Sequence, residues 1–161
     1  MRLFIRQKVF SLRDRFYILD ESGAPRYAAE GEFLSWGRRL HVYDAAGGEA
    51  AFLQQKVWSF LSRYFIFIGG IQAAEVVREF TLFRPFYRVD GPGWEVEGDF
   101  WAHEYRITQG AREVARIHKQ WMTWGDCYEL DVADPADETL ALAVVLVIDC
   151  VTADGSSSAA H

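Results

Sequence analysis

The sequence predicts a mainly β protein, a closed barrel of about twelve strands around one buried apolar C-terminal α-helix. The first observation behind this fold is a series of short strand-like segments, separated by turn signals, that continues to residue 132. The second is the run Leu140–Ile148, which is apolar at every position. A helix there has no face for water and must be buried. A sheet that closes around this helix accommodates both features.

The strands are delimited by Gly- and Pro-containing turns such as residues 21–25, 46–48 and 90–93. Several segments alternate apolar and polar residues, which predicts one buried and one wet face. The expected strands are residues 3–5, 15–19, 26–32, 39–43, 49–57, 64–68, 74–83, 86–89, 94–98, 104–108, 112–119 and 126–132. The residues expected to face inward are Trp94, Val96, Tyr105, Ile107, Ala115, Ile117, Tyr128, Leu130 and Val132.

The apolar segment is expected to form a helix over about residues 137–150. A membrane span is the alternative, but it needs about 20 apolar residues. The fully apolar run is much shorter, with acidic residues at both ends and no Lys or Arg after Lys119. We therefore expect a core helix inside one domain, residues 1–152, followed by a disordered tail, residues 153–161.

The composition excludes several classes of protein. Cys127 and Cys150 form neither a disulfide framework nor a metal motif, and no signal peptide is recognisable, which favours a cytoplasmic protein. None of the four histidines has zinc-ligand spacing, so no metal and no cofactor is expected. The chain is acidic, with a net charge of -6, and shows no nucleic-acid-binding motif.

Charge is unevenly distributed along the chain. All 17 Lys and Arg residues lie within residues 1–119, whereas residues 120–161 contain only acidic charges. An Arg-rich N-terminal part is suited to bind phosphate or carboxylate groups. The simpler interpretation is that these are solvated strand faces that pair with the acidic end of the same chain.

Aromatic residues gather in two places. One is Trp58, Phe60, Tyr64, Phe65 and Phe67, beside Lys56 and Arg63, and the other is Phe100, Trp101, Trp121 and Trp124. Aromatic residues next to basic ones are able to insert at a membrane interface. The interpretation favoured from the sequence is that they fill the barrel core.

The order of the motifs resembles the LURP-one-related family and its tubby C-terminal-like fold, over roughly residues 2–152. The segments that carry the resemblance are Phe4–Lys8, Arg15–Asp20, Trp94–Phe100, Ile117–Trp121 and Gly125–Val132, followed by the apolar helix. The resemblance implies a closed twelve-stranded barrel around a central helix. Tubby proteins, which resemble this fold, bind phosphoinositides through basic residues on the barrel, but none of those residues aligns with a position of this chain.

The first functional hypothesis is a non-enzymatic binding module with a basic barrel face. Its partner is expected to be an anionic phospholipid surface, with a peripheral position at the membrane, or another protein, but no nucleic acid. The candidate contacts are Lys8, Arg13, Arg15, Lys56, Arg63, Arg84 and Arg88. The alternative is a small-ligand carrier or an enzyme, with a pocket at a barrel mouth near His103 and His118. A third possibility is a structural protein that acts through oligomerisation.

Overall fold

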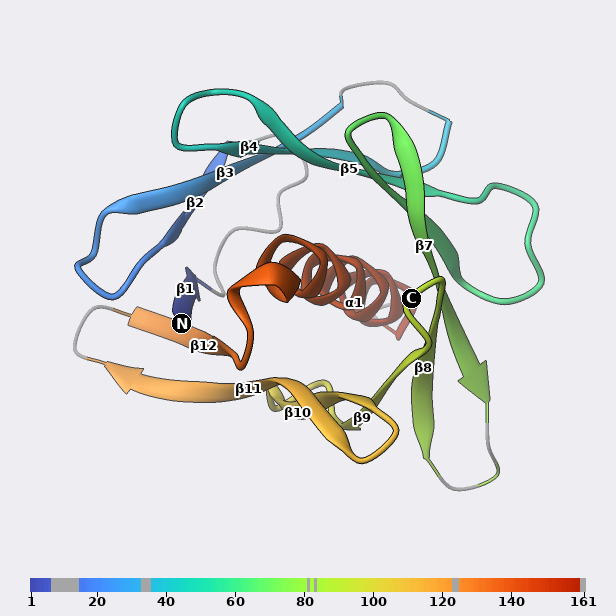
Figure 1. Ribbon diagram of the computed structural model, residues 1–161. Coiled ribbons are helices and arrows are strands. Elements are labelled where there is room, and N and C mark those ends of the chain that lie inside the picture. Colours follow the sequence, from blue (N-terminus) through green and yellow to red (C-terminus); the bar gives the residue numbers. More distant parts are fainter. Residues whose placement is uncertain (7–14, 33–35, 81, 83, 123–124, 160–161) are drawn as a thin grey trace.

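The computed structural model describes residues 1–6, 15–32, 36–80, 82, 84–122 and 125–159 of the chain. It is a closed antiparallel barrel around a C-terminal helix (Figure 1). The strands are β1 (Arg2–Arg6), β2 (Phe16–Leu19), β3 (Pro25–Gly31), β4 (Arg39–Asp44), β5 (Glu49–Gln55), β6 (Arg63–Ile68), β7 (Ile71–Phe80), β8 (Pro85–Asp90), β9 (Trp94–Asp99), β10 (Glu104–Gln109), β11 (Arg112–Met122) and β12 (Gly125–Val132). A short 3-10 helix, η1 (Pro135–Asp137), leads into α1 (Glu138–Ala159).

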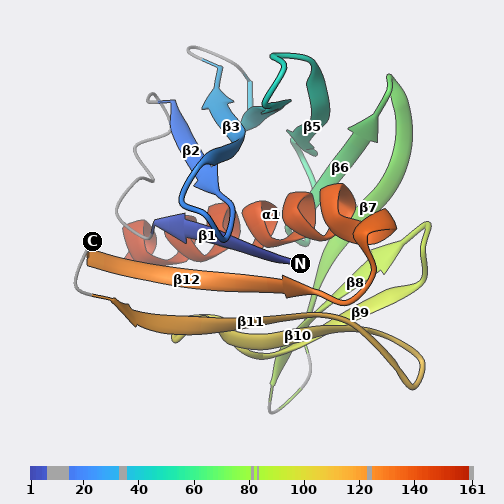
Figure 2. The same cartoon turned by 60° about the vertical axis from the view of Figure 1, so that its left-hand side comes forward.

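Each strand pairs with its neighbours in the chain, and β1 pairs with β12 to close the barrel. Successive connections therefore alternate between the two ends of the barrel. We call the end where α1 begins the turn end; it holds the connections that follow β2, β4, β6, β8 and β10. We call the end where α1 finishes the loop end; it holds the connections that follow β1, β3, β5, β7, β9 and β11. Figure 2 shows α1 running through the barrel between these ends.

The core lies between α1 and the inward faces of the strands. From Ala141 to Ile148, every residue of α1 has at most 1% of its surface exposed. All nine residues expected to face inward are buried. These observations confirm the predicted barrel, its strands and its central helix. A helix without a polar face is stable only where the sheet surrounds it completely.

The start of α1 is fixed by polar contacts at the turn end. The Asp134 side chain accepts a hydrogen bond from the Ala136 amide (3.0 Å) and so caps η1. Glu138 is buried at the first position of α1, where a carboxylate favours the positive end of the helix dipole. It accepts hydrogen bonds from Arg26 Nε (3.0 Å) and the Tyr27 hydroxyl (2.7 Å). These bonds attach the helix to β3.

The end of α1 differs from the sequence expectation. The ordered domain was expected to finish at residue 152, with a disordered tail from 153 to 161, but α1 continues to Ala159. Asp154 forms an ion pair with Arg38, just before β4, and Gly155 lies next to the Trp101 ring. These contacts with two loops support the extra turns, although the local sequence is rich in Ser and Gly. In the part of the chain that the structure describes, no helix has the length and apolar character needed to cross a membrane.

Candidate functional site

Large hydrophobic side chains are exposed mainly at the loop end of the barrel. Trp58 and Leu82 are more than 90% exposed, Trp36 is 81% exposed, and Phe60 is completely exposed. Phe80, Trp101 and Val57 are also exposed at this end. At the turn end, the exposed large hydrophobic residues of the described chain are Met1 and Ile71. Such a concentration of apolar surface at one end is typical of an interaction site.

The connections that follow β3 and β5 are held against each other. The Arg38 amide donates to Gln55 Oε1 (3.0 Å), and the Gln55 amide donates to the Arg38 carbonyl (2.8 Å). Gly37 has a φ of 76°, and a Cβ there would lie only 2.8 Å from Val57 Cγ2. A side chain at this position would have to displace the Val57 side chain, in a backbone conformation that favours glycine. Gly37 therefore permits the close approach that holds Trp36 next to the loop that carries Trp58.

The loop between β5 and β6 encloses a small hollow of about 270 Å³ together with Gly37. Its lining combines the apolar side chains of the loop with Lys56, Ser59 and Ser62. Trp58 has a φ of 63°, which is unusual for a residue with a bulky side chain, and it is turned out to solvent. The loop thus presents aromatic rings and an ammonium group on the same surface.

The basic residues expected to bind a ligand are only partly brought together. Lys8 and Arg13 lie outside the described residues. Lys56 is exposed at the hollow, and Arg84 is exposed just before β8, at the loop end. Lys56 is the candidate that lies closest in the chain to the exposed aromatic side chains.

Other predicted contacts are engaged in ion pairs on the barrel wall. Arg63 is 2.9 Å from Glu75, and Arg15 is 3.8 Å from Glu30. The Arg88 side chain pairs with Asp90 (2.8 Å) and with Glu79, on the outer face of β8. These pairs neutralise part of the expected basic face, so the free charge at the loop end is smaller than the sequence suggests.

Inside the loop end, polar groups join α1 to the surrounding loops. The guanidinium group of Arg38 contacts Asp154, and burial raises the pKa of the neighbouring Cys150 thiol to about 12. A thiol with this pKa stays protonated and unreactive at neutral pH. Cys150 is therefore a core residue and gives no support for nucleophilic chemistry.

The structure separates the two histidines near which a ligand pocket was the alternative expectation. The His103 side chain is buried, with Nε2 3.3 Å from Asp149 Oδ1 on α1, and its ring stacks on Tyr128 at 4.3 Å. His118 contacts Glu129 and Gln120 on the outer face of β11 and β12. The two side chains do not meet, because one points into the barrel and the other out of it.

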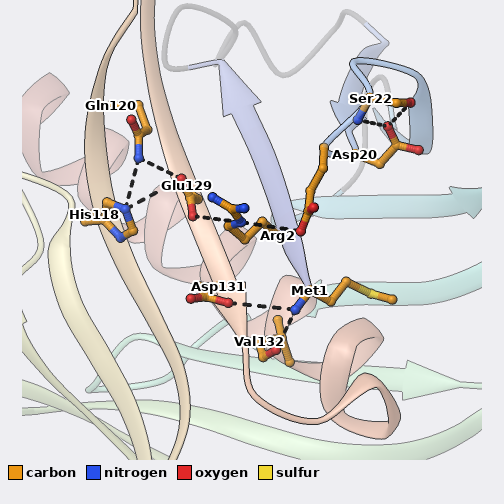
Figure 3. A network of polar contacts seen from close by, with 10 residues as sticks. Met1, Arg2, Asp20, Ser22, His118, Gln120, Glu129, Asp131 and Val132 are labelled. Atoms are coloured by element: carbon orange, nitrogen blue, oxygen red, sulfur yellow. Dashed lines mark hydrogen bonds and ion pairs between the residues drawn. The ribbon is translucent and has the colours of Figure 1, made fainter.

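Glu129 was expected on a wet face of its strand, yet only 3% of its surface is exposed. Figure 3 shows the side chains that cover it on the outside of the barrel. Gln120 Nε2 donates to Glu129 Oε2 (2.6 Å), His118 Nε2 is 3.6 Å from the same oxygen, and Arg2 Nε is 3.8 Å from Oε1. These contacts join β1, β11 and β12 where the barrel closes. We interpret the cluster as a structural one, because its polar groups bind each other.

No cluster of three or more potential metal ligands is present among the residues that the structure describes. The sequence indicated the aromatic groups but favoured a core position for all of them. Tyr64 and Phe100 are indeed buried, whereas Trp58, Phe60 and Trp101 are exposed. The exposed aromatic residues could have been recognised from their positions between the predicted strands. In such loops, no alternation of polar and apolar residues directs a side chain inward. The side chains of Trp121 and Trp124 lie outside the described part.

Comparison with known proteins gives the relatives of this chain. The family model described as LURP-one-related matches residues 1–149. The YxjI protein of Bacillus subtilis (strain 168) is 36% identical over 151 residues, which cover 94% of this chain and 93% of that protein. The crystal structure of the Arabidopsis thaliana protein AT5G01750 superposes with a TM-score of 0.65 at 16% identity, covering 92% and 90% of the two chains, and shows the same tubby-like fold. On this evidence, the chain belongs to the LURP-one-related family.

Proposed function

We propose that this protein is a non-enzymatic binding module that docks onto anionic phospholipid membranes with the loop end of its barrel. The observation that carries the proposal is the exposure of Trp36, Trp58, Phe60 and Trp101 at that end. Tryptophan prefers the membrane–water interface, where its ring is buried and its N–H group stays hydrated. A protein that docks only through charge does not need these rings.

The expected gain from apolar insertion is substantial. Burial of a large hydrophobic side chain is worth about 1.5–3 kcal/mol, so two or three inserted rings supply several kcal/mol. Trp58 and Phe60 lie in the same loop, and Trp36 lies in the loop that packs against it. These three side chains are the expected anchors, since they can enter one surface together.

Electrostatics favours the same orientation. Lys56 and Arg84 are exposed at the loop end, whereas the turn end carries acidic residues, including Asp20, Glu21 and Asp44. An anionic surface therefore attracts the loop end and repels the turn end. A basic residue close to such a surface contributes about 1 kcal/mol, and this contribution falls as salt increases.

Vesicle co-sedimentation tests this proposal. The protein is mixed with neutral phosphatidylcholine vesicles or with vesicles that also contain phosphatidylserine, at low and physiological salt. We expect pelleting with the anionic vesicles, reduced by salt. The double variant Trp58→Ser/Phe60→Ser is expected to weaken binding by at least about tenfold, because it removes two anchors.

Matched variants at the turn end serve as controls. Ile71→Ser removes an exposed apolar side chain there, and Arg112→Glu reverses an exposed charge that pairs with Asp137. Neither should change pelleting, whereas Lys56→Glu should reduce it. If the unmodified protein stays in the supernatant with every vesicle, the lipid proposal is wrong and a protein partner becomes the better explanation. If the double variant pellets normally, the loop end is not the docking surface.

A further inference from the structure

The barrel wall has a gap in its hydrogen-bonded ladder between β8 and β9. The two strands pair only from Tyr87 to Val89, opposite Val96 to Trp94. Beyond this point, Pro85 and Phe86 pair with β7 alone, and residues 97–99 pair with β10 alone. Figure 1 shows the start of β8 diverging from β9. Each strand therefore has an edge that faces the other without pairing to it.

A groove of about 560 Å³ occupies this gap on the outside of the barrel. Arg84, Pro85 and Phe86 form the wall on the β8 side. The remaining lining residues come from β9, β10 and β11, and they include Glu95, Glu97 and Arg106. The groove thus lies along the free edge of β9.

Aromatic side chains close the core beneath the gap. Phe100 packs edge-on against Tyr87 of β8 (4.9 Å between ring centroids) and against Tyr105 of β10 (5.1 Å). Phe100 is itself buried. These three rings separate the core from solvent where the hydrogen-bonded ladder is interrupted. A peptide can therefore bind in the groove without exposing the core.

The geometry points to a binding site for an extended peptide, which would add to the edge of β9 as a further strand. In an antiparallel sheet, alternate residues direct their N–H and C=O groups to each side, so part of residues 97–99 offers its backbone to the groove. Exposed edges of this kind recognise extended peptides through main-chain hydrogen bonds. Pro85 lacks an amide hydrogen, so β9 rather than β8 is the main partner.

The side chains of β9 define the chemistry of the peptide. Glu95 and Glu97 point outward and alternate with the buried Val96. Glu95 makes no ion pair or hydrogen bond within the described residues, and Glu97 binds Arg106 through Oε1 alone. A strand beside residues 97–99 places one outward side chain opposite Glu97 and diagonal to Glu95, which also lines the groove. The peptide should therefore carry Lys or Arg at its outward positions, with apolar residues between them that face the rings beneath the gap.

The test uses a capped synthetic heptapeptide that alternates lysine and valine, titrated into the ¹⁵N-labelled protein. Amide chemical-shift changes are expected at Val96–Asp99. The changes at the turn end should be small. Replacing the central valine of the peptide by proline should weaken binding by about tenfold, because a ladder hydrogen bond is lost. A version with glutamate in place of lysine should bind more weakly still.

Protein variants complete the test. Glu95→Lys changes an exposed, unpaired carboxylate, so the fold is expected to survive, while peptide affinity falls by about tenfold. Glu21→Lys, in the turn after β2, reverses an exposed carboxylate that pairs with Arg2 at the opposite end of the barrel, and it should leave affinity unchanged. The proposal is wrong if up to about 1 mM peptide leaves the β9 amides unshifted. Equal affinity for the proline peptide would also overturn it, and the charges along the edge would then act only to prevent self-association.

Discussion

His103 Nε2 lies 3.3 Å from Asp149 Oδ1, and this contact joins the β9–β10 connection at the loop end to the central helix. The hydroxyl of Tyr128 donates a hydrogen bond to the other carboxylate oxygen of Asp149. Burial raises the pKa of Asp149, while His103 opposes the rise. His103 also has a φ of 53°, a left-handed conformation that is costly for a residue with a side chain. The loop is therefore held in a strained shape by its bond to α1.

Replacement of His103 by alanine should destabilise the protein by about 3 kcal/mol. The variant leaves the buried Asp149 carboxylate with Tyr128 but without its histidine partner. Urea unfolding measures the change in the free energy of unfolding. Adding Asp149→Asn should recover part of the loss, since an amide carries no charge for burial to penalise. Strictly additive effects of the two substitutions would contradict a direct interaction.

His41 gives a pH-dependent contribution to stability. Burial alone would lower its pKa, but hydrogen bonds with Glu49 and Glu32, each 2.8 Å long, raise it above the ordinary value of 6.5. A group whose pKa is raised by folding stabilises the folded state fully below its unfolded pKa. That stabilisation is lost as pH rises through the folded pKa.

His41→Gln should therefore cost about 1 kcal/mol at pH 6 and much less at pH 9. The comparison is made by urea unfolding of both proteins at each pH. The difference between them isolates His41 from the other titrating groups. A difference that stays constant, or grows with pH, would show that the two glutamates do not hold the charged imidazole.

Val145→Asp should prevent folding. Val145 is completely buried in the middle of α1, and a carboxylate there has no partner. Its burial costs more than the 5–15 kcal/mol by which a domain is usually stable. Circular dichroism melting curves measure the effect, with Ile71→Asp as the control because Ile71 is exposed at the turn end. An unchanged melting curve for the core variant would mean that α1 is not the centre of the barrel.

The sequence was sufficient to predict the strands and the buried helix, because alternation and the run Leu140–Ile148 are local signals. The burial of Glu129 could not be predicted from such local signals. Alternation places it on the outer face of β12 correctly, but its burial depends on Arg2 of β1 and on His118 and Gln120 of β11, which reach it across the sheet. Residues that lie beside each other only through strand register leave no local pattern.

The candidate site was harder to predict for a related reason. Trp58 and Tyr64 belong to one aromatic stretch, yet Tyr64 lies on β6 and is buried, while Trp58 lies in the preceding loop and is exposed. Composition does not distinguish them. Likewise, the charges of Arg63 and Arg88 are visible in the sequence, but their acidic partners on β7, Glu75 and Glu79, follow from the sheet register.

The most direct test of the docking proposal is the quenching of tryptophan fluorescence by phospholipids brominated on their acyl chains. On anionic vesicles, the rings at the loop end should enter the interface, and the fluorescence should fall. Trp58→Phe keeps the apolar anchor but removes one fluorophore, so this variant should still pellet and show less quenching. Protein that pellets with anionic vesicles without any quenching would contradict insertion of the loop end.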